Sequence, residues 1–120
     1  MIQAIRLFMF VETAAFLAAA STHFGLLIGG YEHYKAGTAE SVIGIVLLFG
    51  LALTWIAPRA TRTFGLAAQG FALLGTIVGI FTIAIGVGPR TVADVTCHIT
   101  IVIVLVSGLI VAVRARLNPV

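Results

Sequence analysis

Two histidines, His23 and His98, each stand inside an apolar stretch that is long enough to cross a membrane. His23 lies near the end of the first such stretch, and His98 lies near the start of the last. If four stretches cross a bilayer in alternation, the two imidazoles reach the same depth on the same side. Because ionisable side chains are costly in hydrocarbon, a matched pair of this kind predicts a functional site.

Carboxylates accompany the two histidines at this depth. Asp94 stands four residues before His98, which places it one helical turn away on the same face, and Glu40 opens the second apolar stretch. Imidazole and carboxylate groups together are typical ligands of zinc, copper(II) and iron. The sequence therefore predicts a transition-metal site in the outer leaflet, formed by His23, His98, Asp94 and Glu40, with His33 above it as a lid.

A haem is another interpretation of the histidine pair. Two histidines at equal depth on two helices are able to serve as the axial ligands of a b-type haem. Gly25, Gly108 and the small residues from Ala18 to Ser21 would leave space for a porphyrin. Asp94 beside His98 favours a small cation instead, and only Arg90 stands near enough to pair with a haem propionate.

Glu12 is a separate ionisable residue in the first apolar stretch. Eleven residues separate it from His23, which is close to three helical turns and about 16 Å, so the two share a helix face. One interpretation is a hydrogen bond to Gln69, which the sequence places at a similar depth. The other is a proton path from Glu12 past Ser21 and Thr22 to His23, as acid and histidine chains form in proton relays.

The composition determines the class of protein. Of the 120 residues, 61% are hydrophobic and only 9% are charged, and the mean hydropathy is +1.19. A domain whose solvent is water needs more polar surface than this, whereas a chain in lipid does not. The net charge of +3 comes from arginines at the ends of the apolar stretches, which gives no support to nucleic-acid binding. A single cysteine, Cys97, excludes an internal disulfide.

Four apolar spans divide the chain, and we predict them approximately over 7–29, 41–57, 64–87 and 91–113 within one domain of residues 1–120. The loops between them are short, so neighbouring helices must be antiparallel. The predicted fold is therefore all-α, an integral membrane up-down four-helix bundle. Gly75 and Gly79 form a GxxxG pattern that allows close helix packing in lipid.

Positively charged residues predict the orientation of the bundle. Two of them, Lys35 and Arg90, fall on one side of the four spans. The other side holds five: Arg6, Arg59, Arg62, Arg114 and Arg116. Because cytoplasmic loops carry the excess of positive charge, we predict that both termini are cytoplasmic, in a bacterial inner membrane.

These patterns favour a small integral membrane protein that binds a transition metal and serves as a metal-binding or redox subunit. The protein would act as a homo-oligomer or as a subunit of a larger membrane complex. A proton-coupled small transporter or channel is one alternative, and a bis-histidine b-type haem protein that transfers electrons is the other. No motif in the chain indicates a particular reaction.

Overall fold

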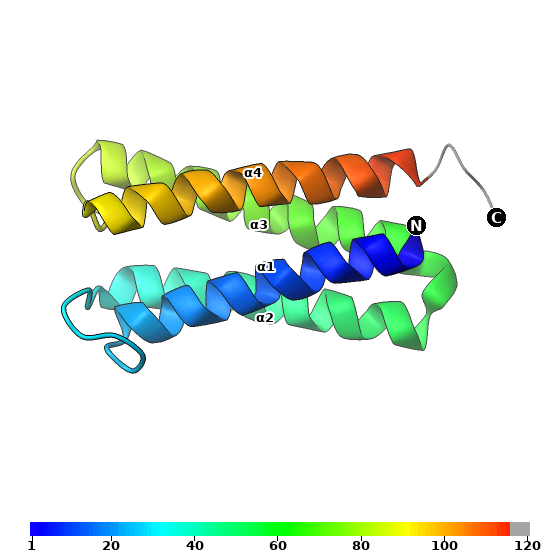
Figure 1. The fold of residues 1–120 in the computed structure, drawn as a ribbon, viewed down its shortest axis with the longest axis horizontal. Helices are drawn as coiled ribbons and strands as arrows, with labels where there is room; N and C mark the ends of the chain where they lie inside the picture. Colours follow the sequence, from blue (N-terminus) through cyan, green and yellow to red (C-terminus); the bar gives the residue numbers. More distant parts are fainter. Residues whose placement is uncertain (116–120) are drawn as a thin grey trace.

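The computed structural model describes residues 1–115, and all regular structure in this part of the chain is helical. The elements are α1 (Ile2–His23), α2 (Tyr34–Ile56), the short 3-10 helix η1 (Pro58–Ala60), α3 (Thr61–Ala84) and α4 (Val92–Arg114). The four long helices lie side by side and alternate in direction, so the start of α1 and the end of α4 share one end of the bundle (Figure 1). The all-helical architecture predicted from the sequence is confirmed.

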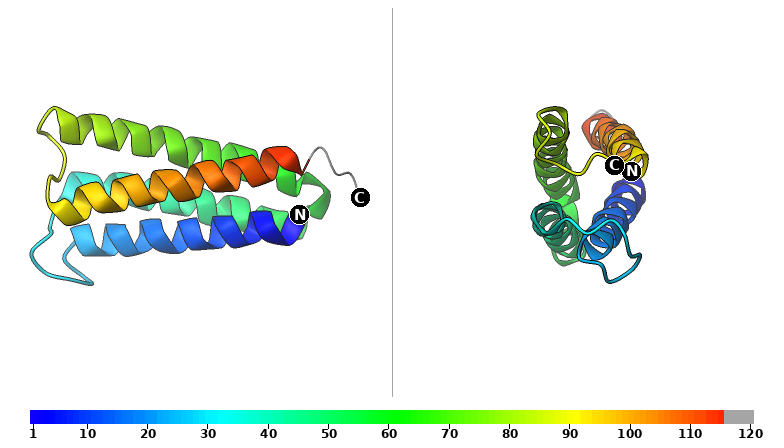
Figure 2. Two further views of the ribbon diagram at one scale, coloured as in Figure 1. Left: turned by 45° about the horizontal axis from the view of Figure 1, so that its top comes forward. Right: turned by 90° about the vertical axis from the view of Figure 1, so that its left-hand side faces the viewer.

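Each of the four long helices is long and apolar enough to cross a membrane. Their outer surfaces carry large apolar side chains; Leu7, Phe10 and Phe49 are 62%, 62% and 66% exposed. A surface of this kind suits lipid and not water, where contiguous apolar patches cause association. The inner surfaces pack around a core cluster that includes Ile5, Met9, Leu47 and Leu105. The end-on view shows the helices running side by side as a bundle (Figure 2).

Glycines allow the helices to approach closely. A Cβ atom at Gly44 of α2 would lie 2.8 Å from Cδ2 of Leu17 on α1. The two glycines of the GxxxG pattern are also used inside the bundle: Gly75 lies against Ile43 of α2, and Gly79 lies against the ring of His98. Simple packing within one chain therefore accounts for this pattern.

The helix α1 ends at His23, whereas the predicted span continued to residue 29. Gly25 adopts a left-handed conformation with φ of +75°. Its N–H donates to the carbonyl of Thr22, and the N–H of Leu26 donates to the carbonyl of Ser21, at 3.0 and 2.8 Å. This pair of bonds is the Schellman ending, in which glycine closes a helix. The span prediction was wrong here because it placed the end of the helix at the later Gly29-Gly30 pair.

The helix α2 begins at Tyr34, whereas the predicted span began at residue 41. His33 caps the helix, because its Nδ1 accepts the N–H of Ala36 at 3.1 Å. A polar segment that the sequence suggested was loop therefore forms the first two turns of α2. This correction matters for the site, since it places Glu40 on the body of a helix and not at its opening.

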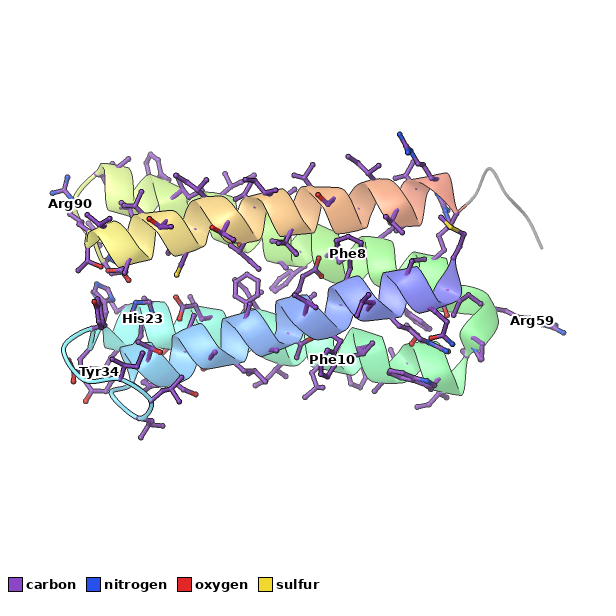
Figure 3. All side chains as sticks on the ribbon, viewed as in Figure 1. Phe8, Phe10, His23, Tyr34, Arg59 and Arg90 are labelled. Atoms are coloured by element: carbon purple, nitrogen blue, oxygen red, sulfur yellow. The ribbon has the colours of Figure 1, made fainter. Side chains whose placement is uncertain are left out.

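We call the two ends of the bundle the His23 end and the Arg59 end, after the labelled residues that lie there (Figure 3). At the Arg59 end, Arg6 of α1 donates two hydrogen bonds to Thr54 of α2. Its Nε donates to the hydroxyl of Thr54 at 3.0 Å, and its Nη2 donates to the backbone carbonyl at 2.6 Å. Arg90 lies at the His23 end (Figure 3). Arg116, which contributes to the predicted orientation, lies outside the described residues.

Candidate functional site

His23 is the last residue of α1, and its ring joins carboxylates from two other helices. Nδ1 lies 2.8 Å from Oε2 of Glu40 on α2, and Nε2 lies 2.9 Å from Oδ1 of Asp94 on α4. We call these three residues the His23 cluster. They are buried, with exposed fractions of 5%, 8% and 7% for His23, Glu40 and Asp94. The cluster therefore ties three helices together at one end of the bundle, where Figure 3 labels His23.

The start of α4 holds the carboxylate of Asp94 in place. Thr91 is the N-cap of this helix, and its hydroxyl accepts the N–H of Asp94 at 3.1 Å. In return, Oδ2 of Asp94 accepts the backbone N–H of Thr91 at 3.2 Å and its hydroxyl at 2.5 Å. This reciprocal pattern is a capping box, which satisfies backbone donors that the helix leaves free. It leaves Oδ1 of Asp94 facing His23 in a predetermined position.

His33, the predicted lid, lies beside His23 but is bound into the surrounding loops. Its ring meets that of His23 edge-on, with 6.3 Å between the ring centroids. Its backbone N–H donates to the carbonyl of His23 at 2.8 Å. Because Nδ1 accepts the N–H of Ala36, the proton of the ring is on Nε2, which donates to the carbonyl of Val87 at 3.3 Å. His33 thus joins the α1–α2 and α3–α4 connections above the cluster.

His98, the predicted partner of His23, is held by its own helix. Its Nδ1 donates to the backbone carbonyl of Asp94 at 2.7 Å. On the opposite side of the ring, a Cβ atom at Gly79 of α3 would lie 3.2 Å from Nε2. Among residues 1–115, no hydrogen bond joins the side chain of His98 to any side chain of the His23 cluster. Both histidines lie at the His23 end, as their equal predicted depth suggested. The rotation of α4 about its axis, however, directs the His98 ring towards α3.

A metal ion or a haem iron would need a free nitrogen on His23. Both ring nitrogens already have carboxylate partners. Coordination of a metal or haem iron would therefore have to replace one of these two hydrogen bonds. Within the described part of the chain, no group of three or more His, Cys, Asp or Glu side chains is arranged as a metal ligand set. Cys97 is exposed on the outer surface of α4 and lies outside the cluster.

Glu12 occupies the middle of the bundle, far from the His23 cluster along α1. It is fully buried, and neither of its carboxyl oxygens has a hydrogen-bond partner among the described residues. Gln69 of α3 is also fully buried, and its Oε1 has no partner either. Both residues face Gly108 of α4: a Cβ atom there would lie 2.8 Å from Oε1 of Glu12 and closer still to Oε1 of Gln69. The structure therefore brings together the two residues that the sequence placed at equal depth.

The predicted proton path between Glu12 and His23 is interrupted in this arrangement. The hydroxyls of Ser21 and Thr22 donate to carbonyls of their own helix at 2.8 and 2.9 Å. Core side chains between the two acidic sites include the apolar Phe16 on α1 and Leu47 on α2. The buried hydroxyl of Thr76 on α3 also donates to a carbonyl of its own helix, at 2.8 Å. A proton would need a change in helix packing to pass this layer.

The hydrogen bonds of the His23 cluster require an additional proton. A carboxylate only accepts, and a neutral imidazole has one N–H, whereas an imidazolium has two. Two bonds from one ring to two carboxyl groups therefore need either an imidazolium or one protonated carboxyl. In both cases the cluster holds one proton more than a neutral imidazole with two carboxylates. Without that proton, two negative charges would be buried together, which is costly in hydrocarbon.

Comparisons of the chain with protein-family models, with curated proteins and with solved structures gave no match. Function must therefore be argued from the geometry of the His23 cluster and of Glu12. The sequence identified all the members of both sites. It assigned Gly108 to the space for a porphyrin, whereas in the structure the missing side chain of Gly108 makes room for Glu12 and Gln69.

Proposed function

We propose that this is a membrane protein that translocates protons, and that the His23 cluster takes up and releases the proton at one end of the bundle. The observation that supports the proposal is that both ring nitrogens of His23 bind carboxyl groups, each from a different helix. Intramembrane acid and histidine groups of this kind are the usual components of proton relays.

Loss of the proton has a direct structural consequence in this cluster. With one N–H instead of two donors, His23 keeps one carboxyl partner and turns a bare nitrogen towards the other. Two acceptors at 2.8–2.9 Å repel each other, so one of the contacts between helices must open. Asp94 is also held by Thr91, whereas the His23 bond is the one described hydrogen bond of the Glu40 carboxyl. Deprotonation therefore changes the packing of helices at the His23 end.

Glu12 is the second ionisable group on the proposed route. It shares α1 with His23 and lies about 16 Å from it along the helix axis. Apolar core side chains lie between them, and the hydroxyls of Ser21 and Thr76 donate within their own helices, so the described residues form no continuous hydrogen-bonded path while the cluster is closed. Opening of the His23 cluster is the event that would let a proton pass between the two sites.

Proton flux into liposomes tests the proposal. The purified protein would be reconstituted with a pH-sensitive dye inside, and a potassium gradient with valinomycin would set an inside-negative potential. We expect faster acidification than in protein-free liposomes. His23→Gln replaces the titratable ring that joins both carboxyl groups with an amide that does not take up a proton, so this variant should fall to the protein-free rate.

His98→Gln is the matched control, since it changes the same residue type at the same end of the bundle but outside the cluster. It should retain the flux of the unmodified protein. Equal flux in the unmodified protein, in His23→Gln and in protein-free liposomes would overturn the proposal. Circular dichroism and gel filtration of each variant would establish that the bundle is folded.

A transition-metal ion at the same residues is the second candidate function. It is favoured by the contact between Nδ1 of His23 and Glu40, because a metal-bound histidine is commonly oriented by a carboxylate on its other nitrogen. Nε2 and Asp94 would then be the ligands. Elemental analysis of protein purified without chelators decides between the candidates, since a stoichiometric metal that His23→Gln loses would favour this one.

A further inference from the structure

Glu12 and Gln69 present a problem of hydrogen-bond satisfaction at the centre of the bundle. Three oxygens are buried there without a partner among the described residues: Oε1 and Oε2 of Glu12, and Oε1 of Gln69. Buried polar groups in folded proteins are almost always hydrogen-bonded, and an unpaired one costs several kcal/mol in hydrocarbon. Three unpaired acceptors at one place therefore indicate that a donor or a cation belongs there.

The amide of Gln69 does not supply the missing donor, because neither carboxyl oxygen of Glu12 has a hydrogen bond from its Nε2. Its Nε2 donates to the backbone carbonyl of Gly65, one turn earlier on α3, at 3.0 Å. This bond leaves Oε1 as the atom that faces Gly108 and Glu12. An ionised Glu12 has only hydrogen-bond acceptors, so it would not provide a donor for Oε1 of Gln69. The described ion pairs all involve His23, so no cationic side chain compensates a charge on Glu12.

We infer that Glu12 is a protonated carboxylic acid that donates its O–H to Oε1 of Gln69, and that Glu12, Gln69 and Gly108 form a second proton-binding site. The inference deepens the proposed function, on which its role in translocation rests, because it identifies where a proton is held in the middle of the bundle. The protonated form removes the buried charge and gives two of the three oxygens a partner.

Gly108 is a determinant of this site although it has no polar side chain. A Cβ atom at this position would collide with the oxygens of both Glu12 and Gln69. The absence of a side chain on α4 therefore allows the acid of α1 and the amide of α3 to meet. Gly70 of α3 provides a matched control, since a Cβ atom there would meet nothing within 4 Å.

A hydrophobic carbodiimide tests the protonated state directly. Dicyclohexylcarbodiimide reacts with a carboxylic acid in an apolar environment: the carboxyl oxygen bonds to the central carbon, one C=N double bond becomes single, and the acid proton moves to that nitrogen. The acyl group then migrates to nitrogen and gives a stable acylurea, with no leaving group. We expect mass spectrometry to find the adduct on Glu12. Glu12→Gln should not be labelled there, and a water-soluble carbodiimide should leave Glu12 unmodified because the residue is fully buried.

Infrared spectroscopy tests the hydrogen bond to Gln69. The difference spectrum between the unmodified protein and Glu12→Gln should contain the C=O band of a protonated carboxyl group. Gly108→Ala should shift this band to higher frequency, because the added methyl separates Glu12 from Gln69 and the acid loses its acceptor. Gln69→Leu should cause a similar shift, and Gly70→Ala should cause none.

Carboxylate bands in place of the acid band, or the absence of any carbodiimide adduct on folded protein, would overturn the inference. Neither readout depends on proton flux. If Glu12 is labelled but liposomes show no flux, the second site stands and the proposed function fails. If flux is present but Glu12 is ionised, the proposed function stands and this site is wrong.

Discussion

Nε2 of His23 and Oδ1 of Asp94 lie 2.9 Å apart, although 71 positions separate the two residues in the sequence. The contact joins the end of the first long helix to the start of the last. Since Glu40 holds the other ring nitrogen, His23 is the central residue of a link between three helices. Protonation and helix packing are therefore coupled at this end of the bundle.

Removal of the helix cap should weaken the bundle without removing any ionisable group. Thr91→Ala eliminates the hydroxyl that accepts the N–H of Asp94 and donates to its carboxylate. We expect a loss of about 1 kcal/mol of unfolding free energy, the usual value of an N-cap. Thr91→Ser keeps the hydroxyl and should recover most of this loss. Denaturant unfolding in detergent, followed by circular dichroism, provides the measurement; equal stability of the alanine variant and the unmodified protein would contradict the capping role.

His23 and Glu40 should be energetically coupled in the folded protein. In a double-mutant cycle of His23→Gln and Glu40→Gln, we expect a coupling energy of about 1 to 3 kcal/mol, because the residues share a buried hydrogen bond. His98→Gln and Glu40→Gln provide the control cycle. No described hydrogen bond joins their side chains, so the coupling in this cycle should be smaller than in the first. A larger coupling in the control cycle than in the first would refute the described pairing.

The two ends of the bundle should differ in their access from outside the cell. In a Cys97→Ala background, Leu27→Cys places a thiol on the α1–α2 connection, and Arg59→Cys places one at the opposite end. The excess of arginines at the Arg59 end predicts that this end is cytoplasmic. A membrane-impermeant maleimide should therefore label L27C on intact cells and R59C only after permeabilisation. The reverse pattern would place the His23 cluster in the cytoplasmic leaflet.

Metal chelation separates the two candidate functions. If the His23 cluster binds protons, dialysis against a strong chelator should leave liposome proton flux unchanged, because the ring nitrogens already have carboxyl partners. A flux that disappears on chelation and returns with zinc, copper or iron would support the metal site instead. In that case His98→Gln should retain metal, since the His98 ring is bound to its own helix.

Several features of the fold follow from the sequence by itself. Hydropathy and helix length predict four long apolar helices, and short connections predict their alternation. The predicted helix ends were less accurate, because the predicted spans follow hydropathy whereas a helix begins and ends at local capping residues. Gly25 and Gly86 end their helices in the left-handed conformation, and His33 caps α2 well before its apolar part begins.

The sequence also determined the depth of each ionisable residue. Helical rise fixes height along an axis, so His23, Glu40, Asp94 and His98 could all be assigned to one end of the bundle. Only the tertiary structure decided their partners. Depth does not set the rotation of a helix about its axis, and rotation is decided by packing that spans the whole chain. This is why Glu40 and Asp94 bind His23, why His98 turns towards Gly79, and why Glu12 meets Gln69 at Gly108.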